Sequence, residues 1–402
     1  MKSLKILLPK SQSTNPNPQP SMLRDRRLLL LLAAGSLTTM AGGVVAPVLP
    51  EVVQQLQLNP VLAGNLVSMH CLTIALFSPF LGILADRFSR LKVLVPSLIL
   101  YAIFGVAGAL MSNFWPLLAT RALLGAASGG IAAASLGLLG SLYEEPERSQ
   151  AIGYATSTLT LTGILFPLLG GWVGASHWQF AFYLYAIGLP LALLALFFLP
   201  EKQQQPAKGL ALDGKQLGAL LKRSQTWRLL VTLSLASATM YAFLIYVPQY
   251  LKQTLAAGTV VNGIVLASTA IGAAVVSALG SSRISQKWGL DRAIALGFGL
   301  MAAMLVAIAQ LGTLNAILPA AVFFGVGFGL ALPSLYAALA NLAPSTMRSS
   351  LLAAGTGAGF LGQFLSPVFL GPVLGAGGIA AVFYAAAIVA MVAGLLLFAP
   401  SR

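Results

Sequence analysis

Two ionisable side chains stand inside long apolar stretches of the sequence, where they could carry a charge or a proton. His70 lies in the uncharged run VLAGNLVSMHCLTIALFSPFL, and Arg121 lies between two further uncharged runs. Ionisable groups at such positions are costly, so a functional role is the default hypothesis. An imidazole titrates near neutral pH and can carry a proton. We therefore predict a coupling or ligand-binding role for both residues. The alternatives are a hydrogen bond to a nearby Ser or Thr for His70 and a tie to backbone carbonyls for Arg121.

A second group of charges is gathered in the segment GILADRFSRLK, from Gly82 to Lys92. It holds Asp86, Arg87, Arg90 and Lys92 between two uncharged runs. Such charges mark a short turn that cannot enter an apolar phase. Basic residues also orient a chain in a membrane, whereas an acid contributes little to orientation. Orientation alone therefore explains Asp86 poorly.

Other common chemistries lack their residues in this sequence. The chain has one cysteine, Cys71, and two histidines, so no internal disulfide and no Cys/His metal cluster can form. Cys71 is predicted to be a small core or lipid-facing residue. GAGFLG, residues 357–362, follows no strand, and no Walker loop is present. The basic residues sit in gaps between apolar runs instead of forming a patch. We expect no metal, no cofactor, no ATP and no nucleic acid.

The elements that carry these residues are predicted to be membrane helices. The 402 residues are 58% hydrophobic and 8% charged, whereas soluble domains are about a quarter charged. A helix needs about 20 apolar residues to cross the hydrocarbon core. Charge-free windows and turn signals predict twelve spans, one each in 28–50, 52–85, 93–120, 122–143, 229–251 and 253–282, and two each in 149–200, 293–347 and 349–401. The fold class is therefore an all-α membrane protein.

Lysine and arginine predict the orientation of these helices. With the N-terminus in the cytoplasm, 21 of the 23 basic residues fall in cytoplasmic segments, only Lys252 falls outside, and Arg121 falls within a span. Such an excess in cytoplasmic loops is the usual pattern of membrane proteins. The sequence thus predicts a multi-pass protein of the plasma (bacterial inner) membrane with both termini in the cytoplasm. The net charge of +14 then reflects this topology and contact with anionic lipid.

The chain repeats itself at an offset of 200 residues. Gly125 matches Gly325, and Pro167 matches Pro367. A repeat of six spans predicts two pseudo-symmetric six-helix bundles of the same topology. One ligand site is expected, at the interface between the bundles near the midplane. The predicted parts are a disordered cytoplasmic tail (1–22), a first bundle (23–200), a cytoplasmic linker (201–225) and a second bundle (226–402).

Short motifs in the chain resemble those of the major facilitator superfamily. Its signature between spans two and three, G-x-L-x-D-R-x-x-R-x-K, is matched by Gly82, Leu84, Asp86, Arg87, Arg90 and Lys92. Four segments are similar to motifs of the family's twelve-span drug/proton antiporter branch: PVLP (47–50), RALLG (121–125), FPLLGG (166–171) and GQFLSPV (362–368). The resemblance assigns close helix packing to Pro47, Pro50, Gly125, Pro167, Gly170, Gly171, Gly362 and Pro367. It covers nearly all of residues 24–400 and implies the major facilitator fold.

The resemblance also implies a gate and a cavity. The gate would consist of Gly82, Asp86, Arg87, Arg90 and Lys92, with Asp86 near the N-terminus of span eleven in one state. Spans one, four, seven and ten line the cavity in this family. Polar candidates for its wall are Thr38, Thr39, Thr158, Thr160, Tyr241, Tyr246 and Tyr336, together with Gln249, Ser334, Asn341 and Gln363.

This resemblance implies a secondary active transporter that works by alternating access, with the proton as coupling ion. The expected function is efflux of a small organic compound, drug-like or a metabolite. An anionic or neutral substrate is favoured because the unpaired charge within the membrane, on Arg121, is positive. The alternatives are an uptake symporter or uniporter and a transport-inactive sensor. An enzyme would need acids or histidines clustered in mid-span, which the sequence lacks. We expect the protein to be a monomer in the lipid bilayer.

Overall fold

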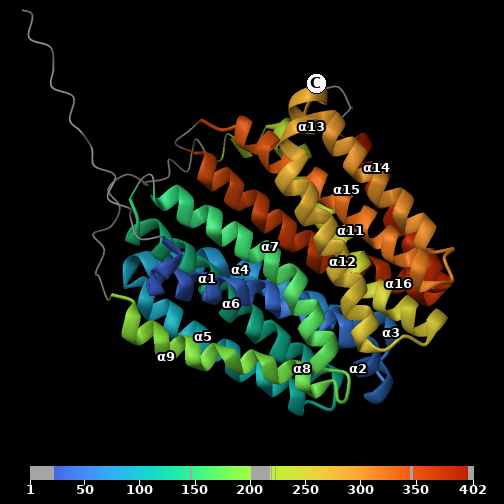
Figure 1. The fold of residues 1–402 in the computed structure, drawn as a ribbon, viewed down its shortest axis with the longest axis horizontal. Helices are drawn as coiled ribbons and strands as arrows, with labels where there is room; N and C mark the ends of the chain where they lie inside the picture. The colour runs from blue at the N-terminus through green and yellow to red at the C-terminus, as the bar shows by residue number, and fades with distance from the viewer. Residues whose placement is uncertain are drawn as a thin grey trace, which may run out of the picture.

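Figure 1 shows the computed structural model, in which the described residues form helices and no strand. The structure describes residues 22–144, 147–200, 218, 220–221, 223–344 and 347–396. The predicted tail lies outside this set except for Met22, as does most of the predicted linker. The helices of the first half are α1 (Arg26–Gly43), α2 (Leu49–Gln55), α3 (Pro60–Ala63), α4 (Asn65–Arg87), α5 (Arg90–Ala107), α6 (Phe114–Leu142), α7 (Glu147–Val173), α8 (Gln179–Tyr183) and α9 (Gly188–Phe198). Those of the second half are α11 (Ser224–Leu255), α12 (Thr259–Leu279), α13 (Ser281–Trp288), α14 (Leu290–Ile308), α15 (Leu314–Asn341) and α16 (Arg348–Leu395).

The described residues form twelve membrane spans, which confirms the prediction. Eleven helical segments among them are long and apolar enough to cross a bilayer, and the last one, α16, has 48 residues. At about 1.5 Å per residue, α16 is far longer than a single crossing requires. Gly378 interrupts it with a φ of 72°, a left-handed conformation that glycine adopts readily. The chain turns there, so α16 supplies spans eleven and twelve.

Both ends of α16 lie at the same end of the molecule. Near its start, Arg348 donates a hydrogen bond to the Ala340 carbonyl at the end of α15, at 3.2 Å. Beyond its last residue, the Leu396 carbonyl accepts hydrogen bonds from Arg228, near the start of α11, at 3.2 and 2.6 Å. Since the spans alternate in direction, the turn between α4 and α5 lies at this end too. We call it the Asp86 end and the opposite one the Glu51 end.

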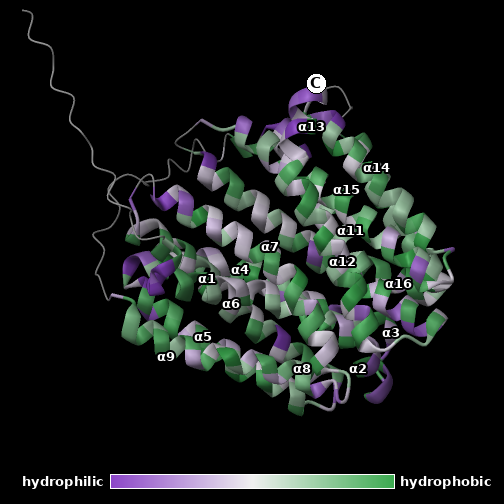
Figure 2. Ribbon diagram, in the orientation of Figure 1, coloured by the Kyte–Doolittle hydropathy of each residue, from purple (hydrophilic) through white to green (hydrophobic). Residues whose placement is uncertain are grey.

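The helices form two bundles that lie side by side (Figure 1). In the first bundle α4 and α5 pack against α6, and in the second α11 packs against α16 and α14 against α15. Contacts of α7 with α12 and of α4 with α16 join the two bundles. Figure 2 shows hydrophobic residues along the sides of both bundles, whereas hydrophilic residues gather near the helix ends, as in α13. This distribution suits a protein surrounded by lipid.

Local sequence explains how the first span begins and where it bends. Asp25 caps α1, because its carboxylate accepts the backbone N–H of Arg27 at 2.8 Å. The same carboxylate accepts the hydroxyl of Tyr143 at 2.6 Å, which ties the start of α1 to the end of α6. Burial, reinforced by this bond, raises the pKa of Tyr143 above its usual value. The span bends at the PVLP segment, where Pro47 and Pro50 lack the N–H groups that would continue α1.

The fourth span begins where the sequence predicts. The charge-free windows 93–120 and 122–143 meet at Arg121, but the sequence places the start of the fourth span near Phe114, and α6 begins at this residue. The turn that precedes α6 contains Asn113, whose backbone is extended, with φ −127° and ψ 153°. That turn is uncharged, so a search for charge-free windows does not detect it. As a result, Arg121 lies about two turns inside α6.

The two bundles are bonded to each other at the Glu51 end. Lys252, on α11, donates a hydrogen bond to Glu51 of α2, and the two charged atoms are 3.2 Å apart. The side-chain amide of Asn262, on α12, donates to the Pro47 carbonyl at 2.9 Å. The hydroxyl of Thr259 donates to a carbonyl of α7 at 2.7 Å. These contacts close the space between the bundles at the Glu51 end.

Candidate functional site

A cavity of about 450 Å³ lies between the two bundles. This volume is within the range of small-molecule sites. Its wall comes from α1 and α7 of the first bundle and from α11, α12, α15 and α16 of the second. The residues that line it are Thr38, Thr39, Gly42, Gly43, Leu159, Thr160, Gly163, Pro167, Met240, Tyr241, Leu244, Leu266, Ala270, Ala273, Ala274, Ser277, Phe328, Gly329, Leu332, Pro333, Phe360 and Gln363. Among these described residues there is no acid, no base and no histidine.

Some of the predicted cavity residues lie in this wall. Thr38 and Thr39 of α1, Thr160 of α7, Tyr241 of α11 and Gln363 of α16 all line the cavity. They come from both bundles, so the structure brings together side chains that are more than three hundred positions apart in the sequence. The cavity lies where the sequence predicts one ligand site, at the interface between the bundles.

Three predicted cavity residues lie outside the wall of this cavity. The hydroxyl of Thr158 turns back to a carbonyl of its own helix, at 2.8 Å. Tyr246 is fully buried, and its hydroxyl lies close to Gly64 at the Glu51 end. The hydroxyl of Tyr336 lies 3.4 Å from that of Thr356. Depth along a span can be estimated from sequence, but the face of the helix on which a lone polar residue lies cannot. Gln249, Ser334 and Asn341 do not line the cavity either.

Span four, α6, does not line the cavity, although the resemblance implies that it should. None of the described residues of α6 lines the cavity, while α7 and α12 contribute a large part of the wall. α6 packs closely against other helices of its bundle. A side chain at Gly129 would meet the backbone of Ser78 on α4, and one at Gly130 would meet Ser97 on α5. Spans five and eight therefore take the place of span four in this wall.

A group of polar side chains at the edge of the cavity connects the two bundles. Cys71, on α4, is fully buried, and its sulfur lies 3.0 Å from Oε1 of Gln363 and 3.2 Å from the hydroxyl of Tyr241. The sulfur also lies 3.4 Å from Nε2 of His70. The sequence interpretation of Cys71 as a core or lipid-facing residue therefore misses its contacts across the interface. Its place beside His70 in the sequence was the one available signal.

His70 occupies the first-bundle side of this group. It is almost fully buried, and Nδ1 has no hydrogen-bond partner among the described residues. A Cβ added at Gly42 of α1 would lie 3.0 Å from the imidazole and 3.2 Å from the Tyr241 hydroxyl. The missing side chain at Gly42 thus leaves room for His70 and Tyr241 to approach each other beside the cavity.

Arg121 lies deeper in the first bundle and does not reach the cavity wall. It is fully buried, and its Nη1 donates a hydrogen bond to the hydroxyl of Tyr185 at 3.0 Å. That hydroxyl donates in turn to the Ala41 carbonyl of α1 at 2.8 Å. The guanidinium also lies over the rings of Phe182 and Tyr185, at 4.7 and 4.9 Å from their centroids. No spacing or motif in the sequence pointed to Tyr185 as its partner.

The guanidinium of Arg121 nevertheless retains unused hydrogen-bonding capacity. Its Nε and Nη2 have no partner among the described residues. Gly125, one turn further along α6, packs directly against the backbone of His70. The two ionisable groups predicted from the sequence are therefore neighbours on two helices in contact.

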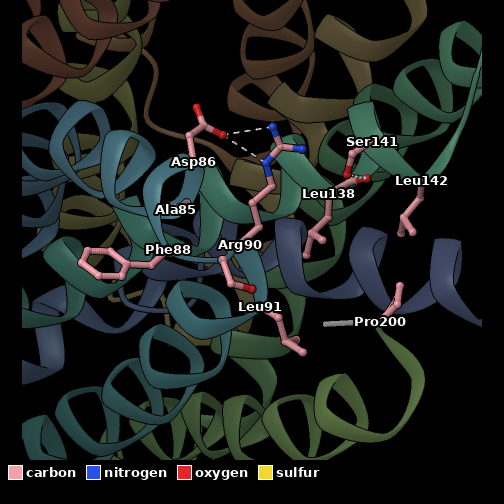
Figure 3. Close-up of a pocket in the computed structure, with 10 residues that line it drawn as sticks. Ala85, Asp86, Phe88, Arg90, Leu91, Leu138, Ser141, Leu142 and Pro200 are labelled. Atoms are coloured by element: carbon pink, nitrogen blue, oxygen red, sulfur yellow. Dashed lines mark hydrogen bonds and ion pairs between the residues drawn. The ribbon is translucent and has the colours of Figure 1, made fainter. Parts of the chain in front are cut away.

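The predicted gate residues lie around the turn between α4 and α5. Figure 3 shows Asp86 paired with Arg90, whose Nη2 is 3.0 Å from the carboxylate. Arg90 also donates to the Gly137 carbonyl of α6, while Arg87 lies over the ring of the adjacent Phe88. Asp86 thus pairs within its own bundle, and the structure records no bond between it and α16 in this conformation. Lys92 is exposed, and Gly82 faces Ala133.

The predicted packing residues stand at close contacts between helices. A side chain at Gly170 would overlap the backbone of Val44, and one at Gly171 would overlap that of Thr259 in the other bundle. A side chain at Gly362 would likewise overlap the backbone of Ser234. Pro167 and Pro367 likewise contact glycines of the opposite bundle, Gly263 and Gly64, and the Pro47 carbonyl accepts Asn262. Pro50 is buried in α2.

Comparison with curated proteins finds bacterial exporters and drug-resistance proteins. The chain is 22% identical over 356 residues to the bacillibactin exporter of Bacillus subtilis, which covers 85% of this chain and 88% of that one. It is 27% identical over 345 residues to the multi-drug resistance efflux pump PmrA homolog of Lactococcus lactis. This alignment covers 81% of this chain and 82% of that one. A 191-residue segment is 25% identical to the quinolone resistance protein NorA of Staphylococcus aureus. It covers 47% of this chain and 48% of that one.

Solved structures share the fold. A bacterial homolog of the human lysosomal transporter Spinster, in an inward-facing and occupied conformation, aligns with a TM-score of 0.81 at 16% identity, over 94% of this chain and 97% of that one. A D-xylose–proton symporter aligns with a TM-score of 0.74 at 16% identity, over 93% and 97%. The family model described as the Major Facilitator Superfamily matches residues 31–367 and 262–402. With two six-helix bundles around a central cavity, this chain belongs to the Major Facilitator Superfamily.

Proposed function

We propose that this transporter exports a small organic compound, anionic or neutral, in exchange for protons. It would act as a monomer in the plasma membrane of a bacterium, with the Asp86 end in the cytoplasm. Two relatives are named as an exporter and as an efflux pump, which supports the direction. The distribution of lysine and arginine supports the orientation.

One observation carries the proposal of proton coupling: a histidine stands beside the contact that joins the two bundles. Cys71 bonds across the interface to Tyr241 and Gln363, and His70 contacts Cys71. A group that gains and loses protons near pH 7 can alter such a contact. His70 is therefore the candidate coupling residue.

A proton on His70 would disfavour the conformation described here. The imidazolium would be fully enclosed, on a helix that packs directly against the one carrying the cation of Arg121. Like charges repel strongly where little water screens them. The repulsion would weaken the contacts of Cys71 with the second bundle and favour their separation. Proton binding would thus shift the protein toward its other state, as coupling requires.

We infer that the charged turn acts as the cytoplasmic gate. The pair of Asp86 with Arg90 would be exchanged for contacts with the second bundle when the Asp86 end closes, with Arg87 and Lys92 beside them and Gly82 allowing close approach. Residues 23–200 and 226–402 would then move as two bodies, with segment 201–225 between them on the cytoplasmic side.

The test uses purified protein in liposomes that contain a pH dye and chloramphenicol, a drug that is uncharged at neutral pH. After dilution into drug-free buffer, an antiporter would exchange outgoing drug for incoming protons, so the lumen would acidify. His70→Ala should abolish this acidification. His177→Ala is the matched control, since His177 is exposed between α7 and α8 and should leave the acidification unchanged.

The other outcomes decide between the alternatives. If the lumen became alkaline as the drug left, the protein would be a symporter. If the drug left without any pH change, it would be a uniporter. Acidification that persists in His70→Ala would retain the antiporter but contradict the role of His70.

A further inference from the structure

The wall of the central cavity has a polar edge and an otherwise apolar lining. Tyr241 and Gln363 lie at one edge, next to Cys71. Most of the other lining side chains are apolar, among them Met240, Phe328 and Phe360. A ligand in this space would therefore bury a large apolar surface and meet hydrogen-bonding groups at one position.

The charged side chains near the cavity are held away from it. The guanidinium of Arg121 is fixed by the hydroxyl of Tyr185, which is bonded to the backbone of α1, and neither residue lines the cavity. Since no lining residue among those described carries a charge, a charged ligand would lose hydration without gaining a counter-ion. Such burial is strongly unfavourable for an ion of either sign.

The polar edge offers both a donor and an acceptor. A thiol has one proton, so Cys71 cannot donate to Gln363 and to Tyr241 at the same time. The shorter contact, 3.0 Å, assigns the thiol proton to Oε1 of Gln363, which leaves the Tyr241 hydroxyl to donate to the sulfur. The amide nitrogen of Gln363 then remains as a donor, because no described residue accepts from it, and the Tyr241 oxygen remains as an acceptor.

From this arrangement we propose that the cavity selects an uncharged, largely apolar molecule with one hydrogen-bonding group placed at Gln363 and Tyr241. The inference rests on the proposed export function and narrows it, since it excludes the anions that Arg121 alone would favour. The apolar body of the ligand would lie against Met240 and the phenylalanines.

The test compares two probes with the same aromatic skeleton. N-phenyl-1-naphthylamine is neutral, and 1-anilinonaphthalene-8-sulfonate adds one negative charge; ethidium serves as a cation. Binding is measured by fluorescence titration with the full chain in nanodiscs. Binding to the cavity is defined as the part lost in Ala270→Trp, which fills the wall on α12. Ile271→Trp, one residue further on the exposed side of that helix, controls for the added indole.

We expect cavity-dependent binding of the neutral probe that is at least about tenfold tighter than that of either charged probe. Tyr241→Phe should weaken the binding of the neutral probe by about threefold to tenfold, because the oxygen that would accept the amine N–H of the probe is lost. Tyr183→Phe, at an exposed position, should have no effect.

Two results would overturn the inference. One is cavity-dependent binding of the sulfonate or of ethidium as tight as that of the neutral probe. The other is binding of the neutral probe that survives Ala270→Trp unchanged. Neither depends on transport: a protein that binds the neutral probe in the cavity but moves no protons in the liposome experiment would retain this inference and lose the proposed export function.

Discussion

Tyr185 determines how a fully buried cation is held within the membrane. Its hydroxyl stands between the guanidinium of Arg121 and the backbone of α1, and its ring packs against that guanidinium. The position of the guanidinium and its link to α1, which lines the cavity, therefore depend on one oxygen atom. This contact is a tie between helices, the alternative that the sequence left open for Arg121, although the tie runs through a side chain.

Tyr185→Phe should lower the free energy of unfolding by about 1–3 kcal/mol, because it removes the hydrogen bond and leaves a buried donor unpaired. The change would be measured as a lower midpoint of thermal unfolding in detergent. Tyr183→Phe is the control, since Tyr183 is 43% exposed on the neighbouring turn. Equal midpoints for the two variants would show that the Tyr185 hydroxyl does not stabilise the fold.

At the residue scale, sequence identified which side chains are unusual but not their partners. His70 and Arg121 could be identified because ionisable groups in apolar runs are rare. Tyr185 and Cys71 belong to residue types that are common in such runs. Their roles depend on which faces of different helices meet, and no short-range pattern encodes that.

At the element scale, glycines govern how closely α7 and α12 approach each other. A Cβ at Gly171 would overlap the carbonyl of Thr259 and lie 3.2 Å from the Cα of Gly263. The close contact between these helices, which closes the Glu51 end, therefore requires a residue without a side chain.

Gly171→Val should keep α7 and α12 apart and favour the conformation that is open at the Glu51 end. Spin labels at Ser176 and Gln253, both exposed near that end, would report a longer distance by electron–electron double resonance. Gly153→Ala, on α7 but with nothing within 4 Å of its added Cβ, should leave the distance distribution unchanged. An unchanged distribution in Gly171→Val would mean that the helices close by another route.

Sequence predicted the helices of this fold well and some of their details less well. Long apolar windows and the 200-residue repeat were sufficient for twelve spans in two bundles. The exchange of span four for spans five and eight in the cavity wall was not predictable, because it depends on packing. Trp178 is a further case: a tryptophan at a span end is usually an interfacial anchor, yet Trp178 is 2% exposed and packs against Phe182.

On the scale of the whole molecule, one ion pair joins the two bundles at the Glu51 end. Lys252 is the only basic residue predicted to lie outside, and it pairs with Glu51 of the other bundle. The side chains are 35% and 17% exposed, respectively, so water surrounds the pair only in part. The pair therefore stabilises the present conformation relative to one in which the bundles separate there.

Glu51→Gln should raise the population that is open at this end by about twofold to fivefold, the range that a partly exposed ion pair contributes. The same pair of spin labels, at Ser176 and Gln253, would measure it. The double variant Glu51→Lys with Lys252→Glu should restore the original distribution, because it rebuilds the pair with reversed charges. Failure of the swap to restore it would indicate that packing, and not charge, holds the end closed.

The position of this ion pair makes the transporter sensitive to the salt around the cell. Dissolved ions screen charges over about 3 Å at 1 M salt, a length comparable with the 3.2 Å separation of this partly exposed pair. In the proposed orientation the pair faces the external medium, so saline surroundings would ease opening toward the outside. Salt in the cytoplasm would leave that step unchanged. In the proposed bacterial host, a move from fresh water to brine would thereby alter the cycle of this protein without any change inside the cell.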